Sequence, residues 1–314
     1  MARAIVYTEL GSPAVLCLIE IPDPVAARGE VVVRIEAAGA NPIDAKLRAG
    51  KRPSPPITEP RPVGFDGAGV VEALGEGVED FAVGDRVAIR EGHGTYASAL
   101  AVSTENLAAL PDSVTAAEGA GIGIPAGTAY QALRSLGVGA GDVLLVHGGS
   151  GAVGQAAVQF AVAWGATVVA TASPARHAQL RELGAIPVAY GDGLLDRVRD
   201  AAPAPVTVAL DCAGTDEAIE TSLALVADRD RIATIVRGPD AASFGIRAFS
   251  GGSPVPLTEQ ELAWRAEALP ETIALLASGD FVIDLGPELP LAEAAQAHEL
   301  MESGAASGKI ILVP

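Results

Sequence analysis

Short runs in which apolar and polar residues alternate make up the first part of the chain, and Gly, Pro or Asp residues separate them. The four clearest runs are ARAIVYTE (2–9), GEVVVRIEAAGA (29–40), GAGVVEALG (67–75) and GDRVAIR (84–90). Short strands separated by turn residues are typical of a β-barrel or a similar closed sheet. The pattern therefore predicts such a sheet for the first part of the chain.

From about Ala120 the strands become apolar throughout and alternate with helices. The expected strands are DVLLVH (142–147), TVVATA (167–172), VAY (188–190), VTVALDCAG (206–214), RIATIV (231–236) and GIRAF (245–249). This alternation predicts a parallel sheet with helices on both faces. After about Gly251 it gives way to a long helix (259–279) and a final strand, GKIILV (308–313), and we expect this tail to return to the first domain.

Charge and composition narrow the range of partners. The 314 residues are 49% hydrophobic and carry a formal net charge of −18, which suits two domains and argues against nucleic acid or an anionic membrane as a partner. Two cysteines, Cys17 and Cys212, cannot form a disulfide framework or a four-thiolate zinc site. The N-terminal residues do not read as a signal peptide, and no apolar run is long enough to span a membrane. We expect a soluble, cytoplasmic protein.

A G-x-G-x-x-G motif lies between a predicted buried strand and the helix that follows it. In that context the first glycine permits a tight turn, the second lets the backbone approach a pyrophosphate, and the third lets the helix pack on the strand. Amides at the helix N-terminus then face the phosphate. We expect a dinucleotide here; the alternative is a tight turn without a ligand. The residues expected to bind it are Gly149, Ser150, Gly151, Ala152, Val153 and Gly154.

The next strand indicates which dinucleotide is bound. NAD sites usually carry an Asp or Glu at its end, but residues 170–173 here contain no acid. Ser173, Arg176 and Tyr190 offer a hydroxyl, a guanidinium and a phenol, which suit a 2′-phosphate. We therefore expect NADPH. Each residue also has a structural alternative: Ser173 as a helix cap before Pro174, Arg176 as a solvated side chain and Tyr190 as packing.

Five segments together resemble the medium-chain dehydrogenase/reductase superfamily, in its zinc-free quinone oxidoreductase-like and enone (alkenal) reductase branch. They are AAGANPIDAKLRAG (37–50), GFDGAGVVEALGEGVEDFAVGDRVA (64–88), GTYASALAV (94–102), HGGSGAVGQAAVQFA (147–161) and SGKIILVP (307–314). The resemblance implies an α/β fold with a GroES-like catalytic domain, 1–122 with 256–314, and a doubly wound Rossmann domain, 123–255. It also implies a crossing helix at GIPAGTAYQAL (123–133), and we expect Thr128 in that segment to bind the cofactor. We further expect a homodimer acting on a small-molecule substrate.

Zinc-dependent relatives carry a Cys ligand in the first of these motifs and His-Glu in the second. This chain has NPID in the first and Phe65-Asp66 in the second. A catalytic zinc needs three good protein ligands, and we expect no metal. Without a Lewis acid, oxidation of simple alcohols is disfavoured. The expected reaction is hydride transfer from NADPH to a conjugated C=C or a quinone, with donors stabilising the charge that develops on the carbonyl oxygen.

The NPID motif supplies the candidate catalytic residues. The resemblance implies that Asn41 and Asp44 lie beside the nicotinamide and the substrate, and that Lys46 matches a lysine that is frequent in the alkenal-reductase-like branch. Lys46, Asp44 and Asn41 are therefore the expected catalytic residues, with Asn41 also contacting the cofactor. In the structural alternative, Asn41 caps a helix, Asp44 is an acid in its first turn, and Asp44 pairs with Arg48.

Weaker candidates and competing functions complete the expectations. His93 and Tyr96 could reach the active site, Cys212 is expected to be structural, and Lys309 fits the closing motif or is a surface lysine. A reductase for enoyl thioesters or natural-product intermediates on the same scaffold is the second enzymatic possibility. An NADPH-binding protein without turnover is the non-enzymatic one.

Overall fold

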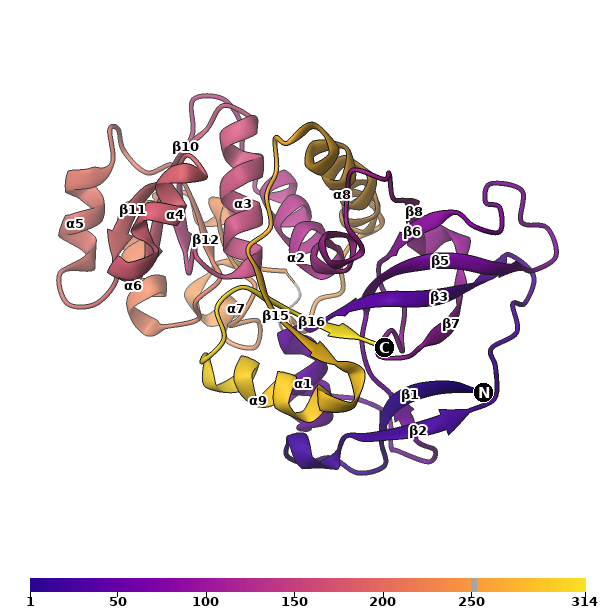
Figure 1. The fold of residues 1–314 in the computed structure, drawn as a ribbon. Helices are drawn as coiled ribbons and strands as arrows, with labels where there is room; N and C mark the ends of the chain where they lie inside the picture. The colour runs from indigo at the N-terminus through magenta and orange to yellow at the C-terminus, as the bar shows by residue number, and fades with distance from the viewer. Residues whose placement is uncertain (250–252) are drawn as a thin grey trace. The chain divides into compact units, whose positions relative to one another are not determined.

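The computed structural model of the chain describes residues 1–249 and 253–314. They form two compact units, each with its own sheets (Figure 1). Unit 1 consists of Met1–Ile124 and Leu269–Pro314, and unit 2 of Pro125–Ala268. The units end at other residues than the predicted domains, whose boundaries stay a prediction. The change of pattern near Gly251 lies outside the described residues.

Unit 1 is mainly antiparallel. A seven-stranded sheet has the order β15-β16-β3-β5-β6-β8 with β7 also paired to β3, and a smaller sheet has the order β2-β1-β4. The strands are β1 Ala2–Tyr7, β2 Cys17–Ile21, β3 Glu30–Gly39, β4 Arg61–Pro62, β5 Asp66–Leu74, β6 Arg86–Ile89, β7 Ala99–Ser103, β8 Leu107–Ala109, β15 Leu285–Pro290 and β16 Lys309–Val313. Because β16 pairs with β3, the end of the chain completes the sheet that its beginning starts, as the sequence predicted.

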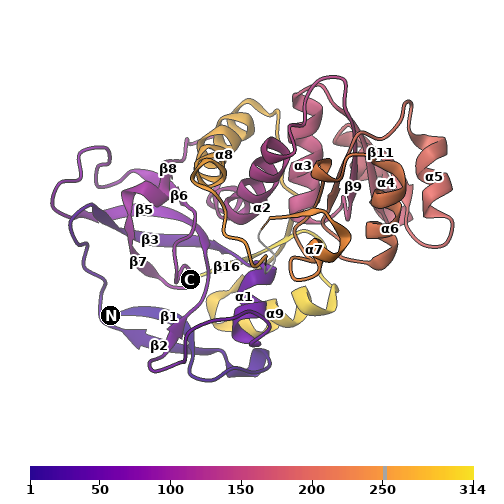
Figure 2. The ribbon, with the colours of Figure 1, turned by 180° about the vertical axis from the view of Figure 1, so that it is seen from behind.

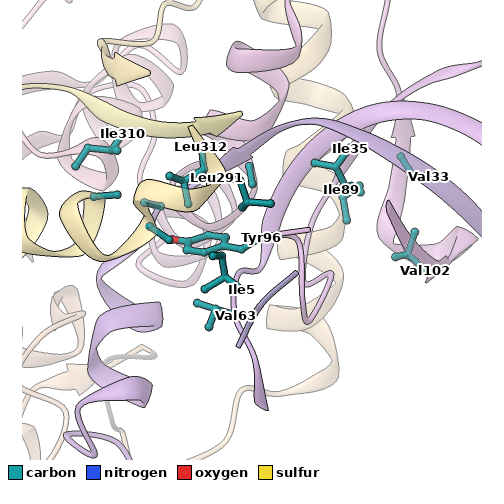
Figure 3. Close-up of a cluster of buried hydrophobic side chains, with 14 of the residues drawn as sticks. Ile5, Val33, Ile35, Val63, Ile89, Tyr96, Val102, Leu291, Ile310 and Leu312 are labelled. Atoms are coloured by element: carbon teal, nitrogen blue, oxygen red, sulfur yellow. The ribbon is translucent and has the colours of Figure 1, made fainter. Parts of the chain in front are cut away.

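Alternation along the strands builds the core of unit 1. Val31, Val33 and Ile35 occupy every second position of β3, so their side chains share one face, and all three are buried. Figure 3 shows Ile35 beside Ile89, and Tyr96 near Ile5 and Leu291. These residues belong to a single buried cluster that contains side chains from both ends of the chain. Tyr7 and Tyr96 are the members of that cluster that carry a polar group, and the fully buried Tyr96 hydroxyl needs a partner inside it.

Helix α1 (Pro42–Arg48) begins where its sequence predicts. Pro42 occupies the first helical position. The Asp44 carboxylate accepts a hydrogen bond of 2.8 Å from the backbone nitrogen of Asn41, and this bond closes the first turn. The alternative that Asp44 pairs with Arg48 is wrong. Arg48 instead bonds to the Gly11 carbonyl oxygen and to Glu302, both at 2.7 Å.

Unit 2 contains the predicted parallel sheet, and Figure 2 shows it from behind. Its order is β11-β10-β9-β12-β13-β14. The strands are β9 Val143–His147, β10 Thr167–Ala172, β11 Ile186–Ala189, β12 Val208–Asp211, β13 Ile232–Thr234 and β14 Arg247–Ala248. The helices are α3 Ala152–Ala163, α4 His177–Glu182, α5 Leu194–Ala201, α6 Asp216–Leu225 and α7 Ala241–Phe244. Every residue of β9 is buried, as expected for a central strand.

Two long helices, α2 (Ala116–Ser135) and α8 (Glu259–Ser278), contain the points where the chain passes from one unit to the other. Each contains a proline, Pro125 and Pro270. The predicted crossing helix is the middle of α2, which extends further in both directions. The sequence did not predict β2, β7, β8, β15 or helix α9 (Ala294–Ser303).

The described part of the chain contains no helix that is both long enough and apolar enough to cross a membrane.

Candidate functional site

The glycine loop of unit 2 connects β9 to α3 and is built for close approach of backbone to backbone. Gly148 has a φ of +71°, a conformation that side chains disfavour. A Cβ on Gly154 would lie 2.3 Å from the Gly148 carbonyl oxygen, and one on Gly149 would lie 2.8 Å from the Cβ of Ala170. The predicted role of Gly149 is therefore wrong: Gly148 makes the turn, and Gly149 lets the loop lie against β10.

The N-terminus of α3 carries amides with no partner inside the helix. Gly151 is its cap residue and has no side chain to accept from the first turn, so the amides of Ala152 and Val153 have no helical acceptor. Gly151 and Ala152 are also exposed. An anion at this position would meet the free donors and the positive end of the helix dipole.

The carboxyl edge of the same sheet brings two predicted residues together. Strands β10 and β11 are parallel neighbours in which Ala172 pairs with Ala189, so Ser173 and Tyr190 leave the sheet side by side. Arg176 follows three residues later, and its guanidinium donates to the Gln179 side-chain oxygen at 3.3 Å. Tyr190 is 61% exposed, which fits a ligand-facing ring better than packing. Ser173 has the predicted cap position before Pro174, although its hydroxyl caps no amide.

Two further unit 2 candidates, Cys212 and Thr128, and Asp211 next to Cys212 lie wholly or partly in the interior of the fold. Asp211 accepts hydrogen bonds from the amides of Ala213 and Gly214 and from the Thr234 hydroxyl, so its carboxylate holds the loop after β12. Burial raises the pKa of the Cys212 thiol, and the neighbouring Asp211 raises it further, so the thiol stays protonated. Thr128 is buried in α2, with 6% of its surface exposed.

In unit 1, Asn41 is fixed by its neighbours. Its side-chain nitrogen donates to the Gly39 carbonyl oxygen at 3.1 Å and to Asp66 at 2.9 Å, while its side-chain oxygen accepts from Lys309 at 2.6 Å. Both amide protons are therefore used, and the residue is 1% exposed. The structure accounts for both side-chain donors of Asn41 within unit 1. A contact between this side chain and a cofactor stays a prediction.

Asp66 and Lys309 form a buried ion pair at 3.5 Å, and both are bonded to Asn41. Two further bonds of 2.9 Å join the Ile124 amide to the two carboxylate oxygens of Asp66. Burial raises the pKa of Asp66 and lowers that of Lys309, and their attraction opposes both shifts. The alternative that Lys309 is a surface lysine is wrong: it is 5% exposed.

Asp44 is the predicted catalytic residue with the most unusual environment. Burial, together with the charge of Asp66, raises the pKa of its carboxyl to about 7, against bonds from Asn41 and Tyr96 that lower it. Asp44 lines a pocket of about 300 Å³ that lies wholly within unit 1. The other lining residues are Tyr7, Leu47, Ser54, Pro55, Arg61, Pro62, Val63, Gly64, Phe65 and His93. His93 therefore reaches a cavity, as the sequence allowed, and its ring packs edge-on against Phe65.

Lys46 lies two residues further along α1 and is half buried. Residues two apart on a helix point to different sides, and Lys46 is not among the residues that line the Asp44 pocket. Burial lowers the pKa of its ammonium, and the neighbouring charges of Arg52 and Lys51 lower it further. The catalytic role of Lys46 stays a prediction.

Sequence comparison matches two families to this chain. The family described as "Alcohol dehydrogenase GroES-like domain" matches residues 27–132, and "Zinc-binding dehydrogenase" matches residues 183–312. The quinone oxidoreductase of Sus scrofa is 32% identical over 339 residues, covering 100% of this chain and 98% of that protein. The chain belongs to the medium-chain dehydrogenase/reductase superfamily, in its quinone oxidoreductase-like group. The predicted family is confirmed.

Solved structures of the superfamily agree in fold over the whole chain. The quinone oxidoreductase of Coxiella burnetii has a TM-score of 0.85 and 29% identity, and covers 100% of this chain and 99% of its own. The Escherichia coli quinone oxidoreductase, solved in complex with NADPH, has a TM-score of 0.83 and 27% identity, with complete coverage of both chains. The predicted α/β class, with a GroES-like and a Rossmann-like part, is confirmed.

The name of the second family raises the question of zinc. Within residues 1–249 and 253–314, no three His, Cys, Asp or Glu side chains are grouped so that they could hold a metal ion. At the two motifs that carry ligands in zinc-dependent relatives, Asn41 and Asp66 are bonded to each other and to Lys309. Zinc independence stays a prediction, and it rests on the presence of these residues where zinc-dependent relatives have metal ligands.

Sequence reasoning missed the group that connects these residues. The sequence motifs indicate Asp66 only as the replacement of a zinc ligand, indicate no role for His298, and indicate Lys309 only as part of the closing motif. The signal that was available is the apolar neighbourhood of each: Lys309 opens the strand KIILV, and Asp66 follows VGF. A charged residue next to a buried strand needs a partner, but the sequence does not say which one.

We predict that Lys309→Met destabilises the protein by about 3–5 kcal/mol, because it leaves the Asp66 carboxylate buried without its cation. Urea unfolding should show a lower midpoint, whereas Lys51→Met, at an exposed lysine, should not change it. The double variant Asp66→Asn/Lys309→Met should recover part of the loss. An unchanged midpoint in Lys309→Met would show that the pair contributes nothing to stability.

Proposed function

We propose that the protein is a zinc-independent, NADPH-dependent oxidoreductase that reduces quinones or conjugated C=C bonds of enones and enals. The observation that carries the proposal is family membership over the full length, together with a glycine loop that has free amides at the start of α3. The quinone as substrate is inferred from the names of the relatives, and NADPH as cofactor from its presence in the Escherichia coli structure. A cytoplasmic homodimer is part of the proposal.

The residues of unit 2 fit a dinucleotide. The amides of Ala152 and Val153 would meet the pyrophosphate, and the missing Cβ of Gly154 lets α3 start close to the loop. Ser173, Arg176 and Tyr190 would bind the 2′-phosphate at the carboxyl edge of β10 and β11, where residues 170–173 contain no acid. When bound, NADPH supplies a hydride.

The substrate's needs follow from the reaction. Hydride addition to an enone or a quinone places negative charge on a carbonyl oxygen, and donors near that oxygen lower the barrier. Lys46 is the proposed cation for this role; because it does not line the unit 1 pocket, it would act on a substrate oxygen that extends beyond that pocket. The apolar pocket in unit 1, lined by Phe65, Val63 and Leu47, has room for a small unsaturated ring.

The function is tested by following NADPH oxidation with quinones, enones, enals and enoyl thioesters. We expect turnover with a quinone or an enone, and the same rate after treatment with a chelator, because no metal takes part. Turnover confined to enoyl thioesters would favour the dedicated reductase. Binding of NADPH without turnover of any acceptor would favour the non-catalytic alternative, and stoichiometric zinc with chelator-sensitive activity would contradict metal independence.

Cofactor choice is tested by Arg176→Ala. A hydrogen bond to a charged group contributes roughly 1.5–3 kcal/mol, so the variant should bind NADPH about 10- to 100-fold more weakly, with NADH binding nearly unchanged. Arg181→Ala, at an exposed arginine of the helix that follows Arg176, α4, is the matched control and should bind both cofactors normally. Titration by calorimetry measures all three proteins. Equal losses for both cofactors would mean that Arg176 acts through folding, and a wild type that prefers NADH would refute the cofactor assignment.

The role of Lys46 is tested by Lys46→Ala. Loss of one donor to a developing oxyanion usually lowers kcat by about 10²- to 10³-fold, and we expect that loss with little change in NADPH affinity. Lys51→Ala removes an exposed charge nearby and should leave kcat unchanged. Steady-state kinetics with the best acceptor from the screen provides the comparison. A normal kcat in Lys46→Ala would make this lysine a solvated helix residue.

A further inference from the structure

The Asp44 carboxyl has two oxygen atoms in different situations. Its Oδ2 accepts hydrogen bonds from the backbone N–H of Asn41 at 2.8 Å and from the Tyr96 hydroxyl at 3.2 Å. Its Oδ1 is buried and has no partner. A charged oxygen in that position is costly, whereas an O–H group there can act as a donor. Because Oδ2 is already occupied, a proton on this carboxyl is carried by Oδ1.

Tyr96 is held in its donating role by His298. The Tyr96 hydroxyl lies 3.4 Å from His298 Nε2, and both side chains are fully buried. Since the single hydroxyl proton goes to Asp44, His298 must donate from Nε2, which leaves Nδ1 as the unpartnered acceptor. Burial, with the charge of Arg48, lowers the pKa of His298 to about 4, so the ring is neutral at pH 7.

Other charged groups around Asp44 act in opposite directions. Asp66 on β5 disfavours the Asp44 carboxylate, while Lys309 on β16 favours it. Arg61 and His93 line the same pocket as Asp44, and His93 is exposed. Asp44 therefore lies at the boundary between a buried network and the pocket, with Oδ1 closed to water in the ligand-free protein, so a ligand must open this contact to reach it.

We propose that Asp44 is the acid of the unit 1 pocket, with Tyr96 and His298 as positioning residues that keep its proton on Oδ1, where it meets the carbonyl oxygen of a quinone or an enone. The identity of this acceptor rests on the proposed function, whereas the protonation of Asp44 does not. As the carbonyl oxygen gains charge, the Oδ1–H bond breaks and an O–H bond forms on the substrate. The hydride comes from NADPH, and Asp44 recovers its proton from water after the product leaves.

The protonated form has a close mimic in Asp44→Asn. Its amide oxygen can replace Oδ2 and accept the two existing bonds, and its NH₂ group can replace the protonated Oδ1. The variant should therefore bind a carbonyl ligand at every pH but be unable to transfer a proton. Tyr96→Phe keeps the ring and removes a bond that favours the carboxylate, so the pKa of Asp44 should rise.

The experiment measures binding of 1,4-naphthoquinone to the full chain loaded with NADP⁺, between pH 5.5 and 9. Wild-type affinity should fall two- to tenfold as the pH rises through about 7, the loss expected for one hydrogen bond. In Asp44→Asn the affinity should not depend on pH, and in Tyr96→Phe the fall should move to higher pH. His93→Gln should keep the wild-type pH dependence, which excludes the exposed imidazole as its source.

Two further readouts separate this proposal from the proposed function. The ¹³C signal of the Asp44 carboxyl, identified by its loss in Asp44→Asn, should titrate near pH 7 whether or not the protein oxidises NADPH. With an active acceptor, kcat of Asp44→Asn should fall by about 10²- to 10⁴-fold. Turnover together with a carboxyl that titrates near pH 4 would overturn the proposal alone. If the variants do not fold, quinone binding to the wild type that is independent of pH would overturn it as well.

Discussion

The buried contact between Lys309 and Asp66, with Asn41 between them, is the interaction on which unit 1 depends. Lys309 belongs to the last strand, Asp66 begins β5, and Asn41 precedes α1, so one cluster joins three distant parts of the chain. Two glycines, Gly39 and Gly123, leave room for this cluster because they have no Cβ. A Cβ on Gly39 would lie 2.8 Å from Lys309 Cε, and one on Gly123 would lie 2.3 Å from Asp66 Oδ1.

The same cluster gives the candidate acid its properties. Asn41 caps α1 with Asp44, and Asp66 supplies the negative charge that makes ionisation of Asp44 less favourable. At the motifs where zinc-dependent relatives have metal ligands, this chain thus has a hydrogen-bonded network with an acid at its edge. A proton donor can serve the reduction of a carbonyl-conjugated acceptor, where charge develops on oxygen, without a Lewis acid.

The fold could be predicted further than the site. Apolar periodicity and the glycine motif were enough for the parallel sheet of unit 2, because its strands are buried on both faces and its turns need glycine. Short strands such as β8, Leu107–Ala109, have no comparable signal. Asn41 and Asp44 were found through their motif, but their partners Lys309 and Tyr96 lie up to 268 residues away, as does His298, which contacts Tyr96, and only folding brings them together. The division of tasks between Gly148 and Gly149 also depended on the exact backbone path.

A crystal structure with NADP⁺ and 1,4-naphthoquinone would test this account most directly. The account predicts one quinone oxygen at hydrogen-bonding distance from Asp44 Oδ1, about 2.5–3.0 Å, with Tyr96 still bonded to Oδ2 and the pyrophosphate at the N-terminus of α3. A quinone oxygen bound to Lys46 while Asp44 Oδ1 stays without a partner would contradict the assignment of the acid. A pyrophosphate bound away from the glycine loop would contradict the account of the cofactor.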